Sequence, residues 1–164
     1  MIPLVITALM AATPPGKLGF DESLNAGWQA VQTGKFDRAA SHYTRALHLV
    51  PDSEDAWLGL QLAHIAAGRW TEALEAGERA LELNPRSYWG LSRQAWAHYN
   101  KGQYSEAEAH YEAALKVNPD DGEMALGLGL ARLAQQDFGG AADACAVAGR
   151  GDVHPPMGSS RVTA

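Results

Sequence analysis

Histidine is the residue type in this chain that most directly suggests chemistry, because imidazole can bind a metal ion or transfer a proton near neutral pH. The sequence has 164 residues and six histidines. His42 and His110 occupy equivalent positions of a repeated pattern, as do His64 and His98, so the repeat itself accounts for four of them. Only His64 and His98 could converge if successive units stack. We expect the histidines to be satisfied within the fold or exposed.

The sequence lacks the motifs that usually accompany catalysis or metal binding. It contains no HExxH, no CxxC, no glycine-rich phosphate loop and no nucleophile elbow. Cys145 is the single cysteine, so the chain can form neither an internal disulfide nor a cysteine-based metal cluster. It lies in an alanine-rich helical pattern, where we expect a small buried apolar residue rather than a reactive thiol. The sequence therefore predicts a protein without enzymatic activity, metal ion or cofactor.

The net charge of the chain argues against nucleic acid as a partner. Thirteen basic and nineteen acidic side chains give a formal net charge of −6. A negatively charged chain is repelled by phosphate backbones, so we expect no nucleic-acid partner. The apolar content of 46% is enough for a sizeable core, and we expect one domain.

The elements that carry these residues repeat along the chain with a period of 34 residues. Three kinds of residue mark the period: a glycine (Gly34, Gly68, Gly102), a proline (Pro51, Pro85, Pro119) and an alanine (Ala39, Ala73, Ala107, Ala141). An aromatic residue follows each glycine position by two: Phe36, Trp70, Tyr104 and Phe138. We expect these aromatic residues to close the end of each unit. One unit is too short to bury its own apolar face, so the pattern predicts an elongated solenoid with an open concave side, which favours binding.

Each unit has the signals of two helices. Apolar residues recur at helical spacing in the range Ser53–Ala67, and a glycine follows, which can adopt a left-handed turn. Thr71 is a competent N-cap for the second helix, and an Asn-Pro pair ends that helix. Ser87 can cap the next first helix. Ser105 and Glu108 have the spacing of a capping box.

These residues resemble the tetratricopeptide repeat. The second unit has Trp57, Leu60, Gly68, Trp70, Ala73, Ala80, Leu81 and Pro85, with Gly77 where a second aromatic residue is usual. The third unit has Ala95, Gly102, Tyr104, Ala107, Tyr111, Ala114, Leu115 and Pro119. The first unit matches from Ala26 to Pro51, and a fourth is degenerate, with Gln136 in place of the turn glycine. The resemblance implies an all-α fold: a solenoid of antiparallel helix pairs with three good repeats and one degenerate repeat, over residues 20–53, 54–87, 88–121 and 122–148.

The resemblance also implies that the first helices of the pairs line a concave groove that binds a peptide or a helix of another protein. The groove positions most directly carried over are Trp28, Asp55, Leu58, Leu62, Trp89, Arg93, Trp96, Tyr99 and Asn100. Further lining positions are Val31, Gln32, Ile65, Ser92, Leu126, Leu130 and Leu133. The positions of the Lys and Asn clamp that grips a C-terminal carboxylate in chaperone-binding members hold apolar residues and a serine here, namely Leu24, Trp28, Leu58, Leu62, Ser92 and Trp96.

Two readings of the groove aromatics stay open. Exposed aromatic residues in a concavity commonly anchor an interface, which favours Trp89, Trp96 and Tyr99 as contact residues. The alternative is that Trp96 and Tyr99 pack against the adjacent unit. Arg93 could pair with an acidic residue of the partner, or it could be a free surface arginine.

The two ends differ from the repeats. Residues 1–19 hold an apolar run, Met1–Ala12, which is either a signal peptide or a helix capping the first repeat, followed by a linker. We expect an exported, periplasmic protein, with a cytoplasmic protein as the alternative and with membrane contact only through this segment if it is not cleaved. Residues 149–164 are rich in Gly, Pro and Ser, and we expect a disordered tail.

We therefore expect a non-enzymatic adaptor that binds an apolar or amphipathic segment of another protein in the concave groove. A second hypothesis is a self-assembling scaffold, a homo-oligomer that stacks through the fourth unit, because this unit lacks the polar helix that usually closes such an array. A third is that the chain is a fragment of a longer protein.

Overall fold

A computed structural model describes residues 15–149, so the run Met1–Ala12 and the tail from residue 150 lie outside the described residues. Within that range the chain forms eight helices and no strands: α1 (Pro15–Gln32), α2 (Phe36–Leu49), α3 (Glu54–Ala66), α4 (Trp70–Leu83), α5 (Tyr88–Asn100), α6 (Tyr104–Val117), α7 (Gly122–Ala134) and α8 (Phe138–Ala148). The predicted all-α class is confirmed. Helix α1 begins within the segment that the sequence assigned to the linker. No described helix has both the length and the apolarity to cross a membrane.

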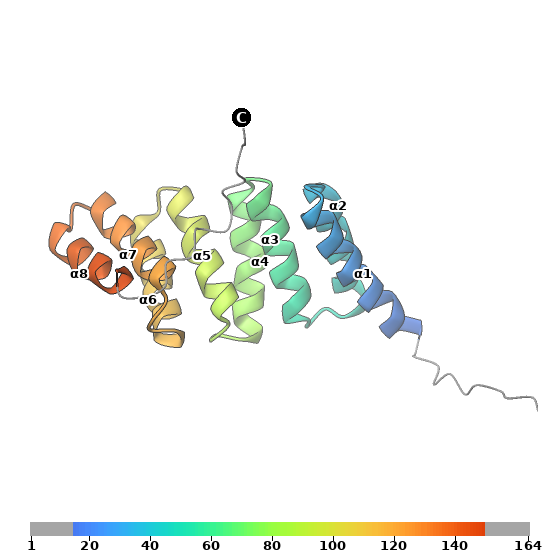
Figure 1. The fold of residues 1–164 in the computed structure, drawn as a ribbon. Coiled ribbons are helices and arrows are strands. Elements are labelled where there is room, and N and C mark those ends of the chain that lie inside the picture. Colours follow the sequence, from blue (N-terminus) through green and yellow to red (C-terminus); the bar gives the residue numbers. More distant parts are fainter. Residues whose placement is uncertain (1–14, 150–164) are drawn as a thin grey trace, which may run out of the picture.

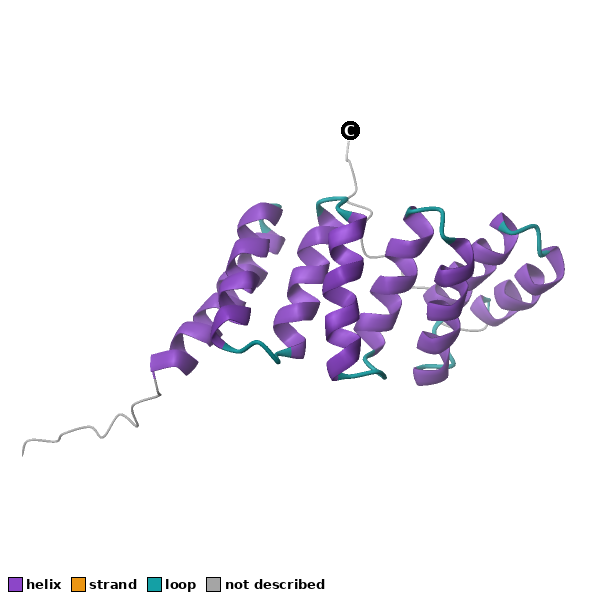
Figure 2. Cartoon of the chain, turned by 180° about the vertical axis from the view of Figure 1, so that it is seen from behind, coloured by secondary structure: helices purple, strands orange, loops and turns teal. Residues whose placement is uncertain are grey.

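The helices form an array of antiparallel pairs, which is the predicted solenoid (Figure 1). Each helix packs against the next along the chain. In addition, α1 contacts α3, α3 contacts α5 and α5 contacts α7, whereas the second helices of the pairs, α2, α4, α6 and α8, do not contact one another. The first helices thus form a continuous inner wall, and the array curves around it. Figure 2 shows the short loops that join the helices at the two edges of the array.

The turn inside each pair has the left-handed backbone that the glycines predict. Gly34, Gly68 and Gly102 have φ angles of 69°, 71° and 76°. Gln136, at the equivalent position of the fourth unit, has a φ of 66°. The fourth turn therefore keeps the geometry of the others although its residue carries a Cβ, which is an uncommon conformation for such a residue.

The helix caps confirm part of the sequence prediction. Ser87 is the predicted cap of α5, since its hydroxyl accepts a hydrogen bond from the amide of Gly90 at 3.4 Å. Ser53, which was not predicted as a cap, caps α3 in the same way and accepts a hydrogen bond from the amide of Ala56 at 3.2 Å. The predictions for Thr71 and for the Ser105–Glu108 capping box are wrong. The left-handed turn is so tight that the aromatic residue itself is already the first helical residue, and the N-cap falls one position earlier, on a side chain that makes no cap bond.

Small residues allow the close approach of helices between and within units. Ala39, Ala73 and Ala107 are fully buried. Tyr43 lies against Gly59 of the following unit, and Tyr111 lies against Gly127 in the same way, since a Cβ at either glycine would come within 2.2 Å and 2.4 Å of the tyrosine rings. The first and third units are therefore each joined to the next unit by an inserted tyrosine ring.

The second unit replaces the aromatic ring with two amides. Gly77 occupies the position equivalent to Tyr43 and Tyr111, and the side chains of Gln61 and Gln94 fill the adjoining space. Both glutamines are fully buried, with exposed fractions of 0% and 1%. This polar cluster joins α3, α4 and α5.

The prediction that Cys145 is buried is wrong, because this residue is exposed. Cys145 occupies the position equivalent to Tyr43, Gly77 and Tyr111, which the first helix of the following unit covers. No described helix follows α8, so the same position is uncovered here. Phe138 is 67% exposed for the same reason, whereas the equivalent Phe36, Trp70 and Tyr104 are partly buried.

Candidate protein-binding groove

One position of the first helices stays open to solvent along the inner wall. Its residues are Trp28, Leu62, Trp96 and Leu130, which we call the axial stripe. Trp28, Trp96 and Leu130 are 53%, 44% and 40% exposed, and Leu62 is partly buried. Four apolar side chains thus recur at one equivalent position along the wall, and apolar residues gathered on an exposed surface often mark an interaction site.

The residues at the neighbouring positions of the same helices are covered by packing between adjacent units. Leu58 and Ser92 are buried, and Val31, Ile65 and Tyr99 are partly buried. The predicted groove residue Leu58 is therefore part of the core rather than accessible to a ligand. Leu126 and Leu133, equivalent to these residues in the fourth unit, are exposed, because no described helix covers them.

Trp96 and Tyr99, which the sequence assigned either to the groove or to packing between units, differ in their surroundings. Their rings stack with centroids 6.2 Å apart and planes 12° apart. Tyr99 also meets Tyr104 edge to face at 5.5 Å and packs against the core cluster around Tyr111. Tyr99 is therefore largely a core residue that supports the face of Trp96, while Trp96 presents its ring to solvent.

Trp89 and Arg93 form a second feature beside the stripe. Trp89 is 47% exposed and lies edge to face against Tyr88, with centroids 5.3 Å apart. The guanidinium of Arg93 lies 5.5 Å from the centre of the Trp89 ring, and its Nη1 donates a hydrogen bond to the backbone oxygen of Leu58 at 2.9 Å. Arg93 thus connects α5 to α3.

The electrostatics of Arg93 are unusual for a surface arginine. Burial lowers the pKa of Arg93 to about 10, and only a weaker interaction with Tyr43 opposes this shift. No acidic side chain of the described residues forms an ion pair with Arg93. Arg93, a partly buried cation in contact with a carbonyl oxygen and an indole ring, can still form a charge-assisted hydrogen bond with a carboxylate of a bound partner.

The two remaining predicted groove residues lie at the ends of the first helices. Asp55 is exposed in the first turn of α3. Asn100 is exposed at the end of α5, where its side-chain amide donates a hydrogen bond to the backbone oxygen of Trp96 at 2.8 Å. Asn100 therefore fixes the end of α5 and has its acceptor oxygen free to face solvent.

The histidines are distributed among structural contacts. Nδ1 of His64 accepts a hydrogen bond from Nε of Arg69 at 3.1 Å, and burial, reinforced by Arg69, lowers the pKa of His64. His98 stacks on His110 with centroids 5.2 Å apart. The pair His64 and His98 does not converge, and the described residues contain no cluster of three or more His, Cys, Asp or Glu side chains that could hold a metal ion.

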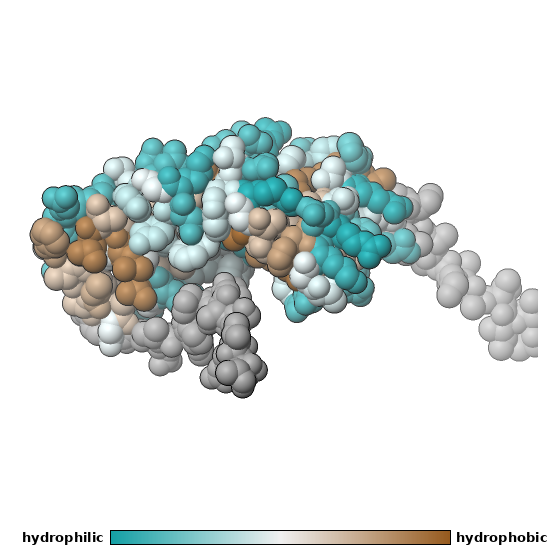
Figure 3. Space-filling view, turned by 90° about the horizontal axis from the view of Figure 1, so that it is seen from above, coloured by the Kyte–Doolittle hydropathy of each residue, from teal (hydrophilic) through white to brown (hydrophobic). Residues whose placement is uncertain are grey.

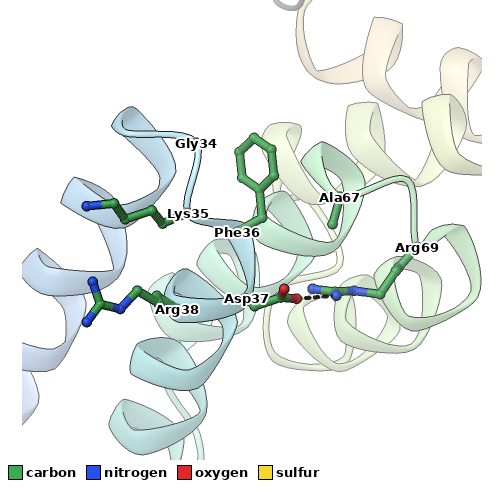
Figure 4. Close-up of a pocket in the computed structure, with 7 residues that line it drawn as sticks. All are labelled: Gly34, Lys35, Phe36, Asp37, Arg38, Ala67 and Arg69. Atoms are coloured by element: carbon green, nitrogen blue, oxygen red, sulfur yellow. Dashed lines mark hydrogen bonds and ion pairs between the residues drawn. The ribbon is translucent and has the colours of Figure 1, made fainter.

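The sequence did not predict the hollow between the turns of the first two units (Figure 4). It has a volume of about 470 Å³ and is lined by Gly34, Lys35, Phe36, Asp37, Arg38, Ala67 and Arg69. Figure 4 shows Asp37 and Arg69 pointing toward each other, and they form an ion pair at 2.5 Å. The ion pair joins the turns of the first two units, and Arg69 is engaged by both Asp37 and His64.

Tyr88 is another contact that the sequence did not indicate. Its hydroxyl donates a hydrogen bond to the carboxylate of Asp121, the residue that caps α7. Burial raises the pKa of Tyr88, and the bond to Asp121 raises it further. The bond joins the start of α5 to the start of α7, and only the 34-residue alignment of Ser87 with Asp121 as N-caps could have suggested it.

The fold and the groove define the class of protein: an α-solenoid of stacked helix pairs whose inner wall presents an apolar surface. The chain belongs to the tetratricopeptide repeat family, whose model matches residues 24–88 and 92–154. No curated protein matches the chain.

Solved structures share the fold at low sequence identity. MamA superposes with a TM-score of 0.76 at 19% identity, over 79% of this chain and 75% of MamA. The first TPR domain of Spaghetti (RPAP3), solved bound to the HSP90 peptide SRMEEVD, superposes with a TM-score of 0.71 at 21% identity, over 73% of this chain and 94% of the domain. The TPR domain of OM64 from Arabidopsis has a TM-score of 0.70 at 17% identity, over 72% of this chain and 98% of that domain.

Proposed function

We propose that the chain is a non-enzymatic adaptor that binds an apolar or amphipathic segment of another protein along the axial stripe. The exposure of Trp28, Trp96 and Leu130 at one equivalent position of the inner wall carries this proposal. In the first three units the flanking positions are buried or partly buried, whereas the tryptophans of the stripe stay exposed. Membership of the tetratricopeptide repeat family supports a role in protein interaction, and the RPAP3 domain illustrates that this fold can hold a peptide.

The chemistry of the groove favours a helix over a C-terminal carboxylate. A helix presents apolar residues every three to four positions, which suits a row of apolar side chains along a groove. The clamp positions carry Leu24, Trp28, Leu58, Leu62, Ser92 and Trp96, and none of these is a cation. Two arginines lie close to the stripe in sequence: Arg132 is two residues after Leu130 and forms ion pairs with Glu108 and Glu112, whereas Arg93 is three residues before Trp96 and forms no ion pair with an acidic side chain of the described residues. We therefore expect the bound segment to carry an acidic side chain beside its apolar face.

Trp96 is the residue whose loss should weaken binding most. An exposed indole that becomes buried in an interface commonly contributes 2 kcal/mol or more, which corresponds to a loss of about 30-fold in affinity. Trp28 should act in the same way at the first position of the stripe.

A displayed library of amphipathic helical peptides, half of them with an acidic flank, tests the proposal. Selected peptides are then titrated against the full chain and against Trp96→Ala, Trp28→Ala and the control Leu83→Ala, whose leucine is 41% exposed at the end of α4. We expect the two tryptophan variants to bind at least tenfold more weakly and the control to bind normally, with unchanged helicity by circular dichroism. Equal binding by all variants would show that the axial stripe does not contact the peptide.

A further inference from the structure

The C-terminal end of the array exposes residues that every other unit buries. Leu126, Leu133, Phe138 and Cys145 are exposed, and we call them the open end. Their equivalents in the first three units are buried or partly buried, and the position of Cys145 is the most deeply covered, since Tyr43 and Tyr111 are 4% and 2% exposed. The open end therefore repeats a surface that accepts a helix three times within this chain. Figure 3 shows apolar surface gathered over α7 and α8 at this end.

The internal interfaces define which kind of helix this surface accepts. The helices that seat on a preceding unit present small or apolar residues at positions i and i+7, namely Ala56 and Ala63 of α3, Gly90 and Ala97 of α5, and Met124 and Ala131 of α7. The position i+3 between them is a glycine in α3 and α7 and is Arg93 in α5, where the guanidinium donates a hydrogen bond to the backbone oxygen of Leu58. Gly59 and Gly127 lie directly under the tyrosine of the preceding unit, and Ala63 and Ala131 are fully buried. We therefore expect an occupant of the open end to offer small or apolar residues at positions i and i+7.

Helix α1 does not meet this requirement. Its residues at the equivalent positions are Glu22, Asn25 and Gln29, all exposed. Seating α1 of a second copy on the open end would bury a carboxylate and two amides without partners, which is costly. A head-to-tail stack of copies, the form of self-assembly suggested by the sequence, is therefore disfavoured.

Helix α8 does meet it. Gly139, Ala142 and Ala146 follow one another at i, i+3 and i+7 and are all exposed. The helix carries one charged residue, Asp143. The same end of the molecule thus has both the apolar surface that accepts a helix and a helix with the accepted spacing, which makes the end complementary to itself. Self-complementary surfaces pair about a twofold axis and form closed dimers.

We propose that the chain forms a twofold dimer in which α8 of each copy seats on the open end of the other. The groove of each copy stays accessible in this arrangement, so the dimer would present two axial stripes. The proposal is independent of what the groove binds.

The mass of the full chain in solution tests the proposal. Light scattering and sedimentation velocity over a wide concentration range should give a mass that rises to that of two chains and stops there. Leu133→Asp and Ala142→Asp should each raise the dimer dissociation constant at least tenfold. The matched control Leu83→Asp changes an exposed leucine at the end of another helix and should leave the constant unchanged.

Cross-linking of Cys145 tests the geometry separately. A short bismaleimide should join two copies through Cys145 in the dimer and should fail with Cys145→Ser, because the twofold arrangement brings the two thiols to one interface. A monomer at all concentrations would overturn the proposal, and so would a mass that grows beyond two chains. A dimer that tolerates both aspartate substitutions, or that yields no cross-link, would also overturn it.

Discussion

Replacement of Gln94 with leucine is expected to stabilise the fold. Gln94 Nε2 donates one hydrogen bond, to the backbone oxygen of Leu74 at 3.1 Å, while its Oε1 and both amide atoms of Gln61 have no hydrogen-bond partner in the described structure. A buried polar atom without a partner costs about 1–3 kcal/mol. The residues equivalent to Gln94 in the second and fourth units are Leu60 and Leu128, so the same helical position accepts a leucine elsewhere in the array, although there the preceding unit presents a tyrosine instead of Gly77.

The expected gain follows from two opposing contributions. Removing Gln94 Oε1 recovers about 1–3 kcal/mol, and losing the bond to Leu74 gives back about 1 kcal/mol. The net effect is a stabilisation of about 1 kcal/mol, which raises the melting temperature by about 2–4 °C for a chain of this size. Urea denaturation followed by circular dichroism measures this difference directly.

A matched control is Gln29→Leu, which changes an exposed glutamine in the last turn of α1 and should alter the free energy of unfolding by less than about 0.5 kcal/mol. A loss of more than 1 kcal/mol in Gln94→Leu would refute the reasoning. It would mean that the amide cluster around Gly77 holds the second and third units together through bonds that the static structure does not display.

Three further predictions concern the end of the array, the groove and pH. Phe138→Ala should cost less than about 1 kcal/mol of folding stability, because the ring is 67% exposed, whereas Tyr104→Ala should cost clearly more in the same denaturation assay. Arg93→Met should change the free energy of unfolding by no more than about 1 kcal/mol, since a methionine avoids the burial of an unpaired charge. In a peptide titration, the preference for acidic-flanked over neutral peptides should be at least tenfold smaller in this variant than in the parent chain. Burial, reinforced by His98, lowers the pKa of His110, so the unfolded chain binds more protons as pH falls through about 6.5. Stability should therefore be full above that pH and lower at pH 5, and His110→Gln should reduce this loss while the exposed control His48→Gln should not.

The sequence predicted the parts of the fold that depend on one residue's own geometry. The glycines at 34, 68 and 102 adopt a left-handed backbone without strain, and Ser87 caps α5 through its own hydroxyl, so a single chain position was enough to identify each of these features. The helix pairs and their order followed from the 34-residue period in the same way.

Exposure could not be predicted as reliably, because it depends on the following unit. Leu58 and Trp96 both belong to the groove pattern, yet one is buried by the adjacent helix and the other is not. Cys145 lies in a position that is buried in three units and exposed in the fourth, which a local pattern cannot reveal. The contact of Arg93 with Leu58 spans two units and has no local signal either.

Because each helix touches only its neighbours in the array, the four pairs should not open with equal ease. The pair α7–α8 is held from one side by α5 and α6, whereas the inner pairs are held from both sides. Cooperative local opening should thus be easier at this terminal pair than at the inner pairs, and its backbone amides should exchange with deuterium before those of α3 to α6. Any partner that covers Leu126 and Leu133 would slow this exchange, so amide protection of the last two helices reports on association without a label.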